Sequence, residues 1–95
     1  MTMDEILQEM RKRLGEQSIK QTVKYDCGDE GVIFVEGSRI DTTDRAADCT
    51  LKISRENVAK LLNGDLQPIT AMMTGKLKIS GSKAAAMKLG AIMEG

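Results

Sequence analysis

The side chains that usually perform catalysis are few in this chain. There is no histidine, so the commonest general base and metal ligand is missing, and nucleophile schemes that depend on histidine are excluded. Cys27 and Cys49 do not form a CxxC pair, and Asp26, Asp29 and Glu30 do not have the spacing of an EF-hand loop. No paired carboxylates and no glycine-rich phosphate loop are evident. The sequence therefore predicts no enzyme activity, no metal site and no cofactor.

The charge balance argues against a nucleic-acid partner. Lys plus Arg and Asp plus Glu both number 14, and the two aromatic residues are too few for a base-stacking platform. Four lysines near the end of the chain could meet an acyl-CoA phosphate or a transient anionic membrane surface, although a solvated face is the commoner reason for such residues. They are Lys76, Lys78, Lys83 and Lys88.

Length and the ends of the chain set further expectations. With 95 residues, the chain is expected to form one domain over 1–95. No apolar tract is long enough to span a bilayer. The first residues place acids before bases, the reverse of a secretory signal, which predicts a cytoplasmic protein with reduced cysteines.

Local signals predict a helix, then four strands, two short helices, a strand and a last helix. Thr2 and Glu5 fit a capping box, and an apolar stripe runs to Leu14 before Gly15. Alternation of apolar and polar residues predicts strands over 19–25, 39–43, 47–53 and 76–79. The uninterrupted apolar run at 32–36 predicts a further strand that is buried on both faces. Ser54, Pro68 and Ser82 mark the starts of the later helices. Short links between the first four strands predict an antiparallel meander with one covered face.

The second half of the chain resembles the sterol carrier protein 2 family of small lipid-binding domains. The matching pieces, in order, are ADCTLKIS at 47–54, LLNG at 61–64, DLQPITAMMTGKLKISG at 65–81 and AMKL at 86–89. The first 46 residues match only in their layout. The resemblance implies an α+β fold, with a five-stranded, largely antiparallel sheet covered on one face by helices. It also implies a hydrophobic tunnel between sheet and helices for a fatty acyl chain, an acyl-CoA, a sterol or a similar apolar ligand.

The resemblance also gives the candidate lipid-binding residues. Met72 and Met73 occupy the family's ligand-facing turn, where other members commonly carry aromatic residues, and methionine can line an adaptable cavity. The remaining candidates are apolar residues that a plain core would explain equally well. The full set is Phe34, Leu62, Leu66, Ile69, Met72, Met73, Leu77, Met87 and Leu89. Phe34 is expected to form the floor of the cavity, and the ligand to enter near residues 64–75.

Three alternatives remain open at this point. A regulatory or protein-interaction module could keep the fold without a functional cavity. An accessory subunit could act on acyl-CoA together with a partner chain. A homodimer could also form, since a short chain with an uncovered apolar edge can bury it against a second copy.

Overall fold

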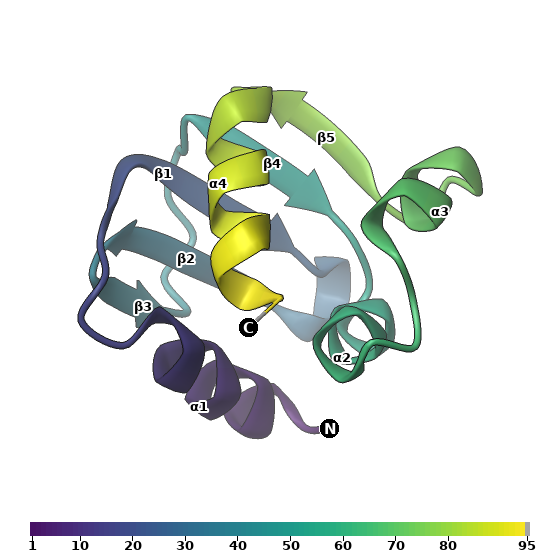
Figure 1. Ribbon diagram of the computed structural model, residues 1–95, viewed down its shortest axis with the longest axis horizontal. Helices are drawn as coiled ribbons and strands as arrows, with labels where there is room; N and C mark the ends of the chain where they lie inside the picture. The colour runs from purple at the N-terminus through teal and green to yellow at the C-terminus, as the bar shows by residue number, and fades with distance from the viewer. Residues whose placement is uncertain (95) are drawn as a thin grey trace.

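Five strands form one sheet whose helices gather on one face (Figure 1). The structure is a computed structural model that describes residues 1–94. Its elements along the chain are α1 (Met3–Leu14), β1 (Ile19–Asp26), the 3₁₀ turn η1 (Gly28–Glu30), β2 (Val32–Gly37), β3 (Arg39–Asp41), β4 (Cys49–Lys52), α2 (Arg55–Asn63), α3 (Pro68–Met73), β5 (Lys78–Gly81) and α4 (Lys83–Met93). This order confirms the predicted α+β class.

The helix boundaries follow the capping signals in the sequence. The Thr2 side chain accepts a hydrogen bond from the Glu5 backbone, and the Glu5 carboxylate accepts one from the Thr2 backbone at 2.8 Å, so the capping box is complete. At the starts of α2 and α4, the side chains of Ser54 and Ser82 each accept a hydrogen bond from the backbone three residues further on. Pro68 stands in the first turn of α3. None of the helices in residues 1–94 is long and apolar enough to cross a membrane.

The inward face of the sheet and the apolar sides of the helices make the main core. On the central strand β1, Val23 and Tyr25 point to the helices, and their neighbours on β2 are Val35 and Ile33. Helix α4 packs across β1 and β4, while α1 contacts α4, β3 and α2 (Figure 1). β2 is buried on both faces, as its uninterrupted apolar run predicted.

The predicted meander is wrong at one strand pair. The strand order is β3-β2-β1-β4-β5, and β4 lies parallel to β1 instead of antiparallel to β3. The connection over residues 42–48 must therefore cross from β3 to β4, a distance of three strand spacings or about 14 Å. An extended segment over these residues is long enough to span that distance. The sheet is still largely antiparallel, because the other three neighbouring pairs are antiparallel.

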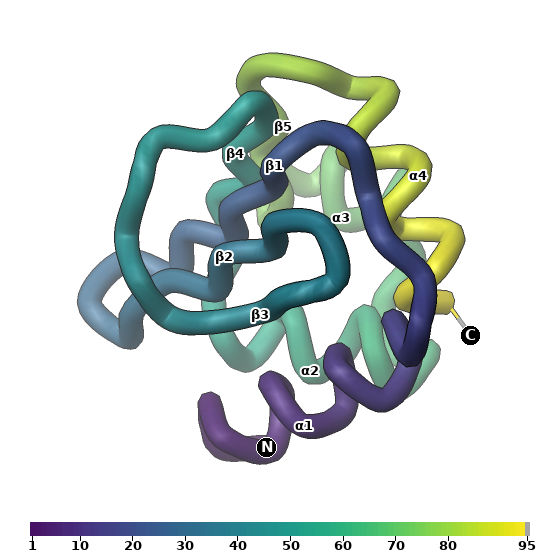
Figure 2. The backbone as a smooth tube through the Cα atoms, turned by 90° about the vertical axis from the view of Figure 1, so that its left-hand side faces the viewer, coloured from purple at the N-terminus to yellow at the C-terminus, as the bar shows by residue number. Residues whose placement is uncertain are grey.

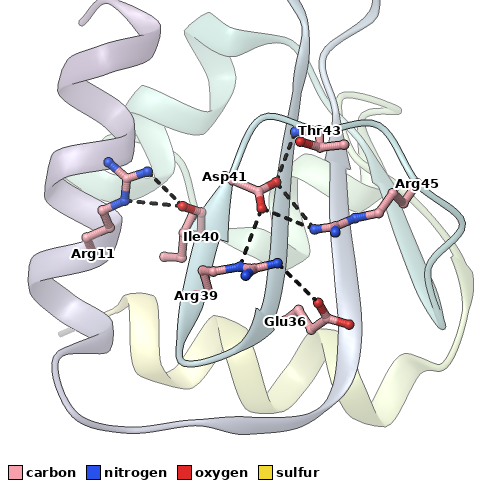
Figure 3. Close-up of polar contacts among 7 residues, drawn as sticks. All are labelled: Arg11, Glu36, Arg39, Ile40, Asp41, Thr43 and Arg45. Carbon is pink, nitrogen blue, oxygen red and sulfur yellow. Dashed lines mark hydrogen bonds and ion pairs between the residues drawn. The ribbon is translucent and has the colours of Figure 1, made fainter.

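This connection covers the face of the sheet opposite the helices. Figure 2 shows it on the side of the sheet away from α4. The guanidinium carbon of Arg45 lies 4.3 Å from the centre of the Phe34 ring, and Arg45 also pairs with Asp41 at 3.1 Å (Figure 3). Asp48 and Thr22 exchange hydrogen bonds at 2.8 and 2.9 Å. These contacts bring β4 to its place beside β1.

Candidate functional site

A pocket of about 320 Å³ opens where α1, α2 and α4 meet one end of the sheet. Its walls combine apolar side chains from all these elements with a few polar ones. The lining residues are Met10, Tyr25, Val58, Leu61, Leu62, Gly64, Leu66, Gln67, Pro68, Gly90, Met93 and Glu94. This is a site for a mainly apolar ligand.

The turn that follows α2 forms part of the rim of the pocket. Gly64 ends α2 in the left-handed conformation, with φ of 79°, which a residue without a Cβ adopts at little cost. The backbone of Leu66 then donates to the carbonyl of Lys60 at 3.2 Å, so the chain folds back over the end of the helix. Leu66 is thereby buried, while Gln67 beside it stays exposed.

Five of the predicted candidates are buried, Phe34 among them, and two of the five line the pocket. Leu62 and Leu66 are both pocket-lining residues. Leu77 and Leu89 lie in the main core and do not line the pocket.

The predicted methionines and Ile69 lie on the surface instead. The exposed fractions are 72% for Ile69, 46% for Met72, 81% for Met73 and 75% for Met87. The physical reason for the first three is that the short helix α3 buries only Ala71, so these three side chains stay at the surface. These four residues do not surround the pocket.

Phe34 lies on the other face of the sheet, and it does not form the floor of the pocket. It pairs with Lys24 on β1 and Asp41 on β3, whereas its neighbours Ile33 and Val35 turn to the helices. Because successive side chains of a strand alternate between faces, Phe34 must point to the crossover connection, where Arg45 covers it.

Several lining residues were not among the candidates, although their patterns were visible. Met10 belongs to the apolar stripe of α1, Tyr25 to the inward side of β1, and Val58 and Leu61 to one side of α2. Met93 is both buried and pocket-lining. Periodicity showed that these residues face inward, but it did not show where the interior is left open.

Arg13 ties together the helices that enclose the pocket. Its guanidinium donates to the carbonyl of Met93 at 2.5 Å and to that of Leu62 at 2.8 Å. Both carbonyls lie in the last turns of their helices, where the helix dipole is negative. Glu9 accepts a further bond from Arg13 at 2.8 Å. One side chain of α1 therefore holds the ends of α2 and α4.

Arg13→Met is expected to lower the free energy of unfolding by about 1–3 kcal/mol, because two charge-assisted hydrogen bonds are lost. Urea unfolding followed by circular dichroism measures this change. Glu9→Gln is the matched control: it removes only a partly exposed ion pair and should cost about 0.5 kcal/mol or less. Equal effects of the two variants would contradict the assigned role of Arg13.

The two thiols are poorly suited to nucleophilic chemistry. Both cysteines are free and buried. Burial raises the pKa of the Cys27 thiol to about 11, with Glu30 and Asp26 adding to the effect, and burial also raises the pKa of Cys49. Within residues 1–94, no three side chains of the His, Cys, Asp or Glu type gather as a metal site.

Comparison with known proteins agrees with this geometry. The profile of the SCP-2 sterol transfer family matches residues 3–94. The sterol carrier protein 2 of Bos taurus is 33% identical over 100 residues, which cover 88% of this chain and 18% of that relative. The chain thus spans about a fifth of the length of that relative. The resemblance seen in residues 47–89 extends over nearly the whole chain.

Solved structures share the fold. Sterol carrier protein 2-like 2 of Aedes aegypti superposes with a TM-score of 0.78 at 17% identity, covering 95% of this chain and 94% of that one. Sterol carrier protein 2 of Aedes aegypti, solved in complex with palmitate, has a TM-score of 0.77 at 18% identity and covers 98% and 94%. These likenesses confirm the predicted five-stranded α+β architecture.

Proposed function

The chain belongs to the SCP-2 sterol transfer family, and from that premise we propose that it is a lipid carrier that holds one acyl chain in the pocket between α1, α2, α4 and the sheet. The observation that carries the proposal is the pocket itself, whose walls are mostly apolar. Burying a methylene contributes about 0.8 kcal/mol, so a chain of roughly ten carbons supplies useful affinity without a charged contact.

The volume of the pocket restricts the class of ligand that it can hold. At about 320 Å³ it lies at the small end of ligand sites, which range over about 300–1,000 Å³. This favours a single unbranched chain over a rigid four-ring sterol. The palmitate in the Aedes aegypti complex is a ligand of the favoured kind.

The proposed role is not enzymatic, and it treats residues 1–95 as one lipid-binding domain. The lack of histidine and the raised pKa values of both thiols support a carrier over a catalyst. The presence of an open apolar pocket favours a carrier over an interaction module that has lost its cavity. The two free cysteines suit a reducing compartment, so we place the protein in the cytoplasm.

The exposed side of α3 is the proposed contact with an anionic membrane surface. Ile69, Met72 and Met73 project from a helix whose first residue, Pro68, stands at the pocket rim. From Leu66 to Met93 the chain carries four lysines and no carboxylate, although the whole chain is neutral. Exposed apolar side chains beside uncompensated lysines suit an anionic lipid surface, which would bring the pocket to its lipid source.

Transfer of a fluorescent fatty acid between vesicles tests this function. We expect Met73→Ser to slow transfer from vesicles containing phosphatidylserine about threefold or more, and to leave equilibrium ligand binding unchanged. Met87→Ser, an equally exposed methionine on α4, is the matched control and should transfer at the wild-type rate. Absence of any transfer would contradict the carrier function. Transfer unaffected by Met73→Ser, or gel filtration showing a dimer that this change dissociates, would contradict the membrane contact.

A further inference from the structure

A second hollow, of about 440 Å³, opens at the end of the sheet where β1 and β4 finish and β5 begins. It shares no lining residue with the lipid pocket. The charged residues of its lining are Lys52, Lys76, Lys78 and Asp26. Three lysines against one aspartate leave the hollow with a formal charge of +2, although the whole chain is neutral. Positive charge is therefore concentrated at this end of the sheet.

The register of the sheet forces two of these lysines together. Lys52 on β4 is the direct partner of Lys78 on β5. The side chains of such partners leave the same face of the sheet, with their Cβ atoms about 4.5–5.5 Å apart, and like charges placed there repel each other. Lys76, two residues before Lys78, also lines the hollow. Within residues 1–94 none of the three ammonium groups has a carboxylate within ion-pair distance, so no contact in this part of the chain relieves the repulsion.

The other polar groups of the hollow leave the lysines available to an anion. Asp26 is the register partner of Lys52 on β1, but its Oδ1 accepts a hydrogen bond from the backbone of Gly28 at 3.0 Å. The Ser54 oxygen accepts one from the backbone of Asn57 at 3.1 Å, which leaves the hydroxyl proton free to be donated to a ligand. The helix α2, nine residues long, begins next to this serine, so the positive end of its dipole also lies at the hollow.

We propose that this hollow binds a phosphate monoester, at a site separate from the lipid pocket and not required for the carrier function. At neutral pH a phosphate monoester has a charge of about −1.5 to −2, which matches the +2 of the hollow. A carboxylate or a phosphodiester has a single negative charge and offsets less of the lysine repulsion. The phosphate reaches the site either in a soluble molecule or on a membrane lipid, because Gly75, two residues after the end of α3, lines the hollow next to the proposed membrane contact.

Amide NMR spectra recorded during a titration with glycerol 3-phosphate at neutral pH test the inference. Saturable shifts are expected at the backbone amides of Ser54, Gly75 and Lys76, which line the hollow. The Lys52→Gln/Lys78→Gln double variant should bind the phosphate about tenfold more weakly, the factor that corresponds to about 1.4 kcal/mol shared between two exposed lysines.

The matched control is the Lys12→Gln/Lys20→Gln double variant, which removes the same charge from exposed lysines outside the hollow. It should change the affinity no more than about twofold, because exposed charges far from the ligand are largely screened. Absence of shifts at the hollow, or equal losses in the two double variants, would overturn the inference. The carrier function would then still stand, since fatty acid binding tests it separately.

Vesicle sedimentation identifies the source of the phosphate. Vesicles containing phosphatidic acid, whose headgroup is a phosphate monoester, are compared with phosphatidylserine vesicles of equal surface charge. A preference for phosphatidic acid that Lys52→Gln/Lys78→Gln abolishes supports the site and assigns it to a lipid headgroup. Binding of glycerol 3-phosphate without such a preference supports the site and assigns it to a soluble phosphate.

Thermal unfolding checks the repulsion between Lys52 and Lys78 independently. Without phosphate, Lys78→Gln should unfold at the same temperature as the wild type or higher, because one member of the like-charge pair is gone. Glycerol 3-phosphate should raise the unfolding temperature of the wild type and not that of Lys52→Gln/Lys78→Gln. A ligand-free Lys78→Gln variant that unfolds at a lower temperature than the wild type would contradict the repulsion on which the inference rests.

Discussion

Leu61→Trp is expected to weaken lipid binding at least a hundredfold while the protein remains folded. Leu61 lines the pocket and is only partly buried, so a larger side chain at this position can extend into open space without displacing the core. An indole in the pocket takes the place of the acyl chain and removes its burial energy, about 0.8 kcal/mol per methylene. Titration with a fluorescent fatty acid measures the loss.

Met73→Trp is the matched control for that substitution. Met73 was a sequence-based candidate for the cavity, but its side chain is 81% exposed on α3 and does not line the pocket. The same indole placed there should leave ligand affinity within about twofold of the wild type. If Met73→Trp abolishes binding and Leu61→Trp does not, the ligand occupies a different site from the pocket described above.

Gly81→Ala is expected to destabilise the protein by about 3 kcal/mol or more, or to prevent folding. A Cβ at this position would lie 2.2 Å from the backbone oxygen of Asp48, and φ of 86° is itself unfavourable for alanine. The same oxygen accepts a hydrogen bond from the backbone of Ser82 at 2.9 Å, so Asp48 cannot move away freely. Denaturant unfolding measures the change.

Gly75→Ala separates the close contact from the backbone strain. Gly75 also has a positive φ, 75°, but a Cβ there would meet nothing within 4 Å. Its replacement should cost about 1 kcal/mol, the usual penalty for a left-handed alanine. A Gly81→Ala variant no less stable than Gly75→Ala would contradict the tight packing of β4 against β5.

The secondary structure was predictable because its signals are local. Thr2, Ser54 and Ser82 cap helices through side-chain oxygens that reach backbone groups three residues away. The alternation around Val23 and Tyr25 fixes one inward face of β1 whichever strands lie beside it. Neither signal depends on the rest of the chain.

The parallel pairing of β1 with β4 and the position of the pocket depend on contacts between distant residues. Asp48 pairs with Thr22, and Arg45 covers Phe34, so the crossover is decided by partners that no local pattern connects. The pocket depends in the same way on how α1, α2 and α4 meet. The short α3 was expected to turn its methionines to the ligand, but Ala71 is its only buried residue. Of the residues that the family resemblance suggested, Leu62 and Leu66 line the pocket and the other seven do not.

Native mass spectrometry of the freshly purified protein, followed by lipid extraction, tests the central claim most directly. The account predicts a wild-type protein with one co-purified lipid, an additional mass that is lost in Leu61→Trp and kept in Met73→Trp. An unliganded mass for the wild type that does not change on incubation with fatty acid or an acyl ester would contradict the carrier function.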